Sequence, residues 1–324
     1  MRNERIFASI SDNNYFVILM QTLSSENNFL AIDTHCTLDE AAIVIVSAPY
    51  EHTVSYGGGT RLGPAGIIEA SAFVEFYDDE FEKELCFEKG IATIAPIDFN
   101  EHIDKDALDD IESQVRDLLT LQKFVVTLGG EHTISTAPIK AHFDFFPSMS
   151  ILHFDAHSDL RDTYHNTPFS HACFMARVAE FFPTERIVQV GIRAQCKEEA
   201  EFITQKGIKT MYASAIRRGL WGQHWQEKAV SFLSDEVYIT FDVDYFDPAI
   251  MPATGTPEPD GFLYAETLDV FRQLRRAGKK IIGFDVVELA PSETAPHAAL
   301  TTARLVYKLL NIAFAEPEKF VSAP

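Results

Sequence analysis

The chain has 324 residues, of which 46% are hydrophobic and 23% are charged, as expected for a folded protein with one large domain or two small ones. Its formal net charge of −21 argues against nucleic-acid binding through a basic surface and favours attraction of a small cationic molecule. No segment reaches the roughly 20 apolar residues of a membrane-spanning helix, and the four cysteines are scattered without a CxxC pair. We therefore expect a cytoplasmic protein with reduced thiols that binds neither nucleic acid nor membrane.

Eight short apolar runs, rich in β-branched residues, recur along the chain. They cover residues 42–47, 90–97, 123–128, 150–154, 186–191, 207–212, 236–241 and 280–284. Most are continuously apolar, which is typical of strands buried on both faces of a parallel sheet. Helical spacing of apolar residues appears at 106–121, 264–277 and 298–315. The alternation predicts an α/β domain with a mainly parallel sheet of about eight strands.

Residues 1–40 fit this alternation poorly, and we predict that they form an N-terminal extension or packing arm. Residues 41–324 then make up a single α/β domain. Ligands of open α/β sheets bind at the carboxyl ends of the strands. The residues that directly follow each apolar run are therefore the candidates for a site.

Two acidic clusters each follow one of the predicted strands. Asp155, His157 and Asp159 lie two residues apart in HFDAHSD, and Asp242 and Asp244 repeat that spacing in TFDVDYFDP. Because alternate side chains of a strand point to the same face, each cluster directs its polar groups into one space. Carboxylates packed together require positive charge, and divalent metal ions are its natural source.

A third segment adds an imidazole at an equivalent position. In LGGEHTIS, two glycines follow the predicted strand at 123–128 and lead to His132. A single histidine after a strand is more often structural, but this one accompanies two acidic clusters at equivalent strand ends. Six ligands are too many for one catalytic zinc and suit two ions about 3.5–4 Å apart. Histidine and carboxylate without thiolate favour Mn²⁺ or a similar ion.

These segments resemble the ureohydrolase family of arginases, agmatinases and their relatives. The motifs GGEHTIS, HFDAHSD, SHACFM, TFDVDYFDP with TGTPEPDGF, and GFDVVELAP occur in the family's order and spacing, and YGGGTRLGP resembles its N-terminal motif. The resemblance covers roughly residues 40–310. It implies that residues 41–324 are a catalytic domain with a three-layer αβα fold, often assembled into homo-trimers or hexamers, with two Mn²⁺ ions per subunit.

The resemblance also implies how the two ions are bound. All six ligand positions of the family are matched, by His132, Asp155, His157, Asp159, Asp242 and Asp244. The first ion would contact His132 and Asp159, and the second would contact His157 and Asp244. Asp155 and Asp242 would bridge both ions.

The implied reaction is hydrolysis of a guanidinium, whose pKa of about 12.5–13.8 makes its carbon a poor electrophile. Two metal ions lower the pKa of a bridging water towards about 7, and the resulting hydroxide attacks that carbon. The family's catalytic residues match Asp159, which contacts the hydroxide, His171 in SHACFM, a proton shuttle, and Glu288 in DVVELAP, which pairs with the guanidinium.

Each of these residues also has an ordinary explanation. By residue type alone, His171 is a loop histidine and Glu288 a glutamate at a helix start. Cys173 is a weak candidate nucleophile, because a metal-bound hydroxide makes a second nucleophile redundant. The loop at 254–259 is expected to shape the rim of the site.

The choice of substrate depends on the segment after Asp159. Residues 160–169, LRDTYHNTPF, depart from the arginase pattern and look like the loop of many agmatinases, so we predict hydrolysis of agmatine to putrescine and urea, a step of polyamine biosynthesis. Arg161 leaves an alternative open because arginine binds carboxylates, although pairing with Asp162 or another acidic neighbour is the more ordinary explanation. The alternatives are a guanidinobutyrase, an arginase, a guanidine hydrolase or a catalytically silent family member.

Overall fold

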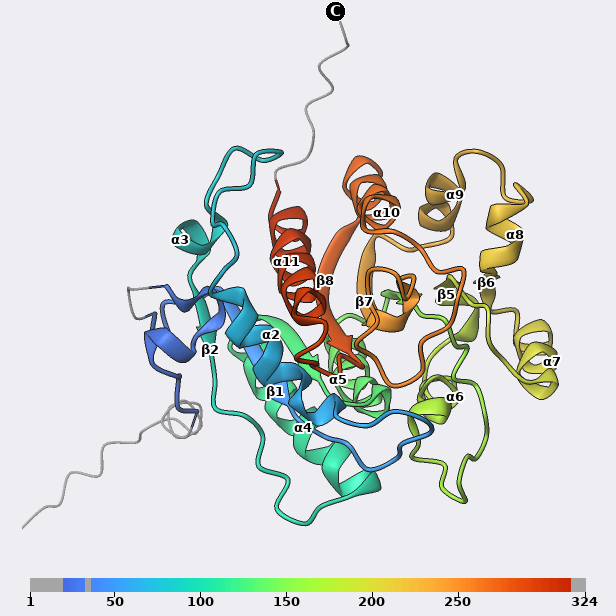
Figure 1. The fold of residues 1–324 in the computed structure, drawn as a ribbon, viewed down its shortest axis with the longest axis horizontal. Coiled ribbons are helices and arrows are strands. Elements are labelled where there is room, and N and C mark those ends of the chain that lie inside the picture. Colours follow the sequence, from blue (N-terminus) through green and yellow to red (C-terminus); the bar gives the residue numbers. More distant parts are fainter. Residues whose placement is uncertain (1–19, 33–35, 316–324) are drawn as a thin grey trace, which may run out of the picture.

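The computed structural model describes residues 20–32 and 36–315. Eight strands form one parallel sheet with the order β2-β1-β3-β8-β7-β4-β5-β6 (Figure 1). Their bounds are β1 Ile43–Ala48, β2 Ile91–Thr93, β3 Phe124–Gly129, β4 Ser150–Phe154, β5 Ile187–Val190, β6 Lys209–Met211, β7 Glu236–Asp242 and β8 Lys280–Val287. Each predicted run overlaps one strand, so the predicted parallel sheet is confirmed.

Helices cover both faces of the sheet. Within the described residues they are α2 Gly63–Ser71, α3 Leu85–Lys89, α4 Asp104–Thr120, α5 Thr136–Phe145, α6 Phe174–Val178, α7 Lys197–Lys206, α8 Ala213–Arg217, α9 Trp225–Ser231, α10 Tyr264–Arg276 and α11 Pro296–Ala313. Apolar residues of α2, α9, α10 and α11 share one core cluster, whereas those of α4 to α7 lie in two others. This arrangement confirms the three-layer αβα fold.

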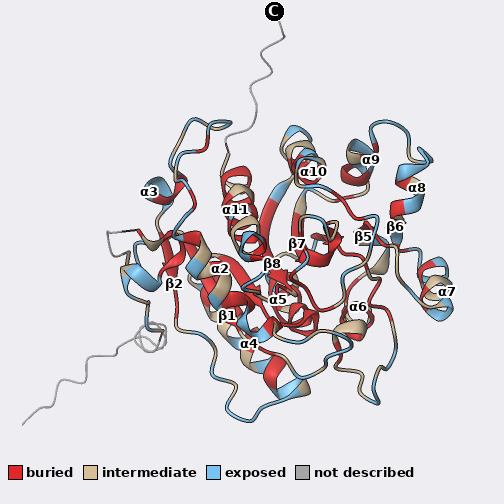
Figure 2. Ribbon diagram, in the orientation of Figure 1, coloured by how far each residue is buried: buried red, intermediate tan, exposed pale blue. Residues whose placement is uncertain are grey.

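Strand β1 illustrates why continuous apolar runs were required. Ile43 and Ile45 pack into the core with α11, while Val44 and Val46 pack into the opposite core with α4. All six of its residues are buried. Figure 2 shows the same concentration of buried residues in the sheet and exposed residues on the outer helix surfaces. A strand covered on both faces has no polar side, which is the pattern that the sequence displays.

The helices follow from their apolar stripes and their first turns. In α4, the buried residues Leu108, Ile111 and Val115 recur at helical spacing, and Asp104 and Asp106 lie in the first turn, where carboxylates stabilise the amide end of the helix dipole. The predicted helix at 106–121 therefore begins two residues earlier than expected. Boundaries shift in the strands too, because β2 keeps only three of its eight predicted residues.

The described part of the N-terminal region packs on the edge of the sheet. Asn28 donates its side-chain amide to the carbonyl of Ile91 at 2.8 Å and accepts the backbone N–H of Thr93 at 2.8 Å. Phe29 and Leu30 are buried in the core. Residues 1–19 and 33–35 lie outside the described residues, so the extension over residues 1–40 stays a prediction.

None of the helices in residues 20–32 and 36–315 combines the length and apolar character needed to cross a membrane.

Candidate active site and metal centre

The carboxyl ends of four adjacent strands, β3, β8, β7 and β4, bring the predicted site residues together. His132 begins a 3-10 turn three residues after β3, and Asp155 directly follows β4. Asp242 is the last residue of β7, and Glu288 directly follows β8. Residues that are up to 156 positions apart in the chain therefore meet at one edge of the sheet.

Three carboxylates surround one nitrogen of His132. Its Nδ1 lies 3.0 Å from Asp155 Oδ2, 3.2 Å from Asp242 Oδ2 and 3.3 Å from Asp159 Oδ2. Although it is buried, this nitrogen forms no hydrogen bond within the described part of the chain. An imidazole nitrogen and three carboxylate oxygens that converge without hydrogen bonding to one another are arranged as ligands of a cation.

A second set of ligand atoms adjoins the first. His157 Nδ1 lies 2.9 Å from Asp244 Oδ2 and 3.6 Å from Asp155 Oδ1. Asp155 thus presents one oxygen to His132 and the other to His157, as a carboxylate shared by two ions would. Asp242 accepts the backbone N–H of Asp244 on Oδ1 at 2.8 Å, which leaves Oδ2 for the site.

The charges of this cluster are poorly balanced by the protein itself. Burial, together with the charges of Asp244 and Asp155, raises the pKa of Asp242 well above its usual value. Burial and the charge of Asp155 raise the pKa of Asp159 to about 7. Burial opposes the charged form of His132, but the neighbouring carboxylates of Asp155, Asp159 and Asp242 outweigh it and raise the pKa of the imidazole. Carboxylates and an imidazole whose pKa values are raised in this way lack compensating positive charge, and divalent cations would supply it.

His153 is a residue that the sequence reasoning missed. Its Nε2 lies 2.8 Å from Asp155 Oδ2, close enough for His153 to resemble a further ligand. Its Nδ1, however, accepts a hydrogen bond from Gln189 Nε2 at 3.1 Å, and Gln189 Oε1 is occupied by the Thr210 hydroxyl. Nε2 therefore carries the proton and donates it to Asp155. Burial lowers the pKa of His153, so the ring is neutral and orients the carboxylate.

A buried carboxylate supports His132 from the opposite side. The Nε2 atom of His132 lies 3.0 Å from Thr240 Oγ1, which donates to Asp285 Oδ1 at 2.7 Å. Asp285 also accepts hydrogen bonds from Ser135 and Tyr238, each at 2.8 Å. Because the Thr240 hydrogen is committed to Asp285, His132 donates from Nε2, and the lone pair of Nδ1 faces the three carboxylates.

His171 lies beside the cluster and is held by two hydroxyl groups. Its Nδ1 is 3.0 Å from Thr53 Oγ1, and its Nε2 is 2.8 Å from Ser55 Oγ. Thr53 donates to Glu131 at 2.9 Å, so the proton of the ring lies on Nδ1 and Nε2 is an acceptor. Burial lowers the pKa of His171 to about 4, which keeps the ring neutral near pH 7. Thr53, Ser55 and Glu131 were not predicted as site residues.

Glu288 is partly buried, with a left-handed backbone φ of 66°. Its Oε1 accepts the backbone N–H of His132 at 2.7 Å, and burial with the nearby charge of Glu131 raises its pKa well above the usual value. Two glycines make room for it: Gly57 donates to the carbonyl of Gly255 at 3.0 Å, and a Cβ on either residue would lie within 3.0 Å of the other's carbonyl oxygen. Their contact closes two loops beside the Glu288 carboxylate.

The cluster adjoins a pocket of about 260 Å³, which is lined by its members His157, Asp159, Asp242 and Glu288 and by His171. We call the seven residues at the strand ends the floor of the pocket: His132, Asp155, His157, Asp159, Asp242, Asp244 and Glu288. We call the four side chains that line the pocket further out the mouth: Arg161, Tyr164, Glu199 and Glu258. The predicted partner of Arg161 was Asp162 or another acidic neighbour. Asp162 pairs with Arg177 at 3.0 Å, and the acidic neighbour of Arg161 is Glu199, at 3.9 Å.

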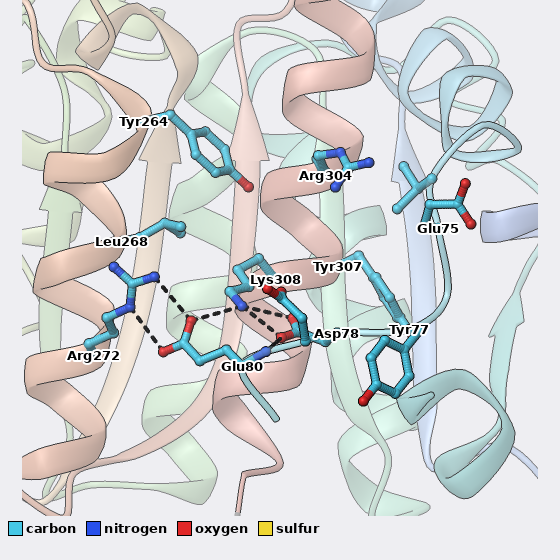
Figure 3. Close-up of a pocket in the computed structure, with 12 residues that line it drawn as sticks. Glu75, Tyr77, Asp78, Glu80, Tyr264, Leu268, Arg272, Arg304, Tyr307 and Lys308 are labelled. Carbon is cyan, nitrogen blue, oxygen red and sulfur yellow. Dashed lines mark hydrogen bonds and ion pairs between the residues drawn. The ribbon is translucent and has the colours of Figure 1, made fainter. Parts of the chain in front are cut away.

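A larger pocket of about 510 Å³ lies elsewhere, between α10, α11 and the segment that follows α2 (Figure 3). Its charged groups mostly bind one another: Arg272 donates to Glu80, and Lys308 pairs with Asp78 and Glu80. None of the floor residues lines it. The chemistry predicted from the sequence therefore belongs to the smaller pocket.

Comparison with known proteins gives a consistent result. The model of the arginase family matches residues 41–311. An N(1)-aminopropylagmatine ureohydrolase from a Synechocystis species is 38% identical over 299 residues, which cover 89% of this chain and 94% of that protein. An agmatinase from Bacillus cereus is 35% identical, with coverage of 83% and 91%. The crystal structure of an agmatine ureohydrolase from Thermoplasma volcanium has a TM-score of 0.79 at 27% identity, with coverage of 89% and 94%.

Proposed function

Because the chain belongs to the arginase family and is a hydrolase of amidino carbon–nitrogen bonds, we propose that it is a two-manganese ureohydrolase that converts agmatine to putrescine and urea. The observation that carries this proposal is the pair of adjoining ligand sets that share Asp155, with the carboxylate of Glu288 beside them in the pocket. Agmatinases among the relatives and the structural neighbours support the substrate.

The donor atoms fit two Mn²⁺ ions. His132 and Asp159 would hold one ion and His157 and Asp244 the other, with the carboxylates of Asp155 and Asp242 shared. When bound, the ions would supply the positive charge and Lewis acidity that make a water a strong nucleophile near neutral pH. His153 and Thr240 would fix the orientation of this ligand set from behind.

Glu288 would hold the substrate guanidinium. One of its oxygens is fixed by the His132 backbone N–H, and the carboxylate lines the pocket. A guanidinium beside it would make a charge-assisted hydrogen bond and stabilise the ionised form that burial disfavours. A neutral guanidine analogue would lose this gain.

His171 would move the proton of the reaction. Its Nε2 accepts a proton, since Thr53 fixes the ring hydrogen on Nδ1, and a protonated His171 could then donate to the departing amine. Ser55 lies between this nitrogen and the open part of the pocket. Asp159, with its carboxylate in the ligand set and a pKa of about 7 before any ion binds, would assist the transfer.

A second candidate substrate is N(1)-aminopropylagmatine. The relative with 38% identity carries that activity in its name, and so does a Thermus thermophilus relative with 33% identity over 279 residues. Both candidates have a guanidinium at one end and an amine further along an aliphatic chain. The two therefore make the same demand on the floor and differ further out, where N(1)-aminopropylagmatine is longer and carries an additional secondary amine.

We also propose that the protein is a cytoplasmic homo-oligomer, a trimer or a hexamer, as the family resemblance implies. The four cysteines are free of disulfides, which is compatible with a reducing compartment. Light scattering after gel filtration would give the subunit number, and a stable monomer would contradict this part of the proposal.

The test is urea release by the Mn²⁺-loaded protein. The substrate panel contains agmatine, N(1)-aminopropylagmatine, arginine, guanidinobutyrate and guanidine, and mass spectrometry gives the metal content per subunit. We expect two ions and the highest kcat/KM on one of the two amines. No urea from any compound would overturn the enzyme, whereas release only from guanidinobutyrate or arginine would overturn the amine substrate.

A further inference from the structure

The mouth of the pocket contains one arginine and two glutamates, and their partners differ. Arg161 already has compensating neighbours, because its Nε lies 3.9 Å from Glu199 Oε2 and its guanidinium lies 5.1 Å from the centre of the Tyr164 ring. Glu199 in turn accepts hydrogen bonds from Ser158 and from backbone N–H groups. The positive charge of Arg161 is thus engaged by the protein.

Glu258 has fewer compensating neighbours than Arg161, which has both a carboxylate and an aromatic ring beside it. Within the described residues, the only cationic or imidazole group near its carboxylate is His157, whose Nε2 lies 4.0 Å from Oε1, beyond hydrogen-bond distance. The Glu258 side chain is 39% exposed and lines the pocket together with His157 and Glu288. The uncompensated charge at the mouth is therefore negative, and it faces the same space as the floor.

The backbone fixes the position of Glu258. Arg193 donates to the carbonyls of Glu258 and Pro259, each at 2.9 Å. The same guanidinium donates to the carbonyl of Asp244 at 2.7 Å and to that of Tyr245 at 3.3 Å. Arg193 thus ties the loop that carries Glu258 to the turn that carries a predicted metal ligand, so the backbone from which the Glu258 carboxylate extends is fixed at the rim of the pocket.

We propose that Glu258 binds the terminal ammonium group of the substrate while Glu288 binds its guanidinium. The inference rests on the proposed function, since it assigns the second end of a substrate that the floor hydrolyses. Two carboxylates in one pocket suit a chain that is cationic at both ends. A guanidino acid would place its carboxylate against Glu258, and guanidine would leave Glu258 unused. The residue thus makes the pocket selective for guanidino amines.

The test removes the charge from the protein and the amine from the substrate in turn. The kcat/KM values of the wild type and Glu258→Gln are measured with agmatine and with n-butylguanidine, which lacks the amine. We expect the variant to lose about tenfold on agmatine, mainly through KM, and to be unchanged on n-butylguanidine. Glu293→Gln, which removes one exposed charge outside the pocket, is the matched control and should change neither value.

Metal content separates this role from support of His157. Glu258→Gln should keep two Mn²⁺ ions per subunit, and equal losses on both substrates or loss of metal would overturn the proposal. In Glu258→Lys, we expect the ratio of kcat/KM on guanidinobutyrate to kcat/KM on agmatine to rise by about tenfold or more relative to the wild type. Unchanged selectivity in both variants would also overturn it. A wild type that hydrolyses n-butylguanidine but shows no preference for agmatine refutes this inference alone, whereas a wild type inactive on every guanidine refutes the proposed function with it.

Discussion

The floor and the mouth of the pocket differ in how their side chains are positioned. Floor residues such as Asp155 and Asp242 lie at or directly after strand ends, are almost fully buried and have their oxygens directed by hydrogen bonds. Mouth residues such as Arg161 and Glu258 lie in loops and are more than one-third exposed. The difference fits the proposal that the floor carries out the reaction and that the mouth discriminates among substrates.

The largest expected effect comes from breaking the floor. Asp155→Ala should lose both metal and urea release, since each oxygen of this carboxylate serves a different ligand set. Metal analysis and the urea assay measure the two losses. Asp162→Ala, which removes an aspartate whose side chain is 93% exposed, is the matched control and should retain both properties. Two ions per subunit in Asp155→Ala would contradict the shared carboxylate.

A smaller loss of activity is expected from replacing His171, which lines the pocket beside the floor. His171→Asn should lower kcat about 10²–10³-fold while both ions stay bound, because it removes a proton carrier and no ligand. Burial lowers the pKa of His171 to about 4, so this group is neutral above that pH and becomes charged only as the pH falls through it. The acid limb of kcat/KM that disappears in the variant should therefore lie near pH 4.

An acid limb of the kcat/KM profile that lies near pH 6.5 and vanishes in His171→Asn would contradict the lowered pKa of His171. Thr53→Val tests the tautomer separately, because it removes the hydroxyl group that links His171 to Glu131 and keeps the side-chain volume similar. Thr53→Ser restores a hydroxyl and is the matched control. Thr53→Val should lower kcat more than Thr53→Ser does. Equal kcat values would show that the hydroxyl link between His171 and Glu131 has no influence on the imidazole.

For His153, which donates a hydrogen bond to the floor residue Asp155, the expected loss is in metal affinity. His153→Phe should weaken Mn²⁺ binding about 10–100-fold, because the donor that orients Asp155 is lost while a buried ring remains. Titration of metal-free protein gives the affinity, and excess Mn²⁺ should restore most of the activity. An unchanged affinity would mean that Asp155 is positioned without His153. Failure of excess metal to restore turnover would mean that the ring does more than orient this ligand.

The smallest effect is expected from the arginine of the mouth. Arg161→Met should change kcat/KM for agmatine by less than about threefold, because its charge is already engaged by Glu199 and Tyr164. Metal content should not change. A loss greater than tenfold on guanidinobutyrate alone, starting from substantial wild-type activity, would show instead that Arg161 selects a carboxylate and that the mouth prefers acids.

The contrast between floor and mouth also explains what the sequence could predict. Strands leave a strong signal because they are apolar on both faces. The sequence predicted that Asp155, His157 and Asp159 share one space, but they follow β4 in an irregular segment in which Asp159 has a left-handed φ of 52°, so strand alternation is not what brings them together. His153 continues the same spacing in the sequence but was read as part of the strand, because an imidazole within an apolar run carries no sign of its partner. That partner, Gln189, lies on the neighbouring strand β5, and no local pattern links the two.

Loops carry no comparable periodicity. Thr53 and Ser55 reach His171 across more than 110 positions of chain, and Glu258 was placed only within a segment that shapes the rim. The order of the strands was equally out of reach, since β3 and β8 are neighbours although residues 130–279 separate them. Such pairings depend on the packing of the whole domain.

The position of β8 in the sheet has a consequence for folding of the chain during its synthesis on the ribosome. β8 is the last strand to be synthesised, yet it lies between β3, on the side of the first three strands, and β7, on the side of the other four. His132 follows the first group, and the five other predicted ligands follow the second. A nascent chain that ends before residue 280 therefore has no strand to join the two groups. We expect the growing polypeptide to capture manganese only after almost the whole domain has emerged, so that metal uptake reports completed synthesis.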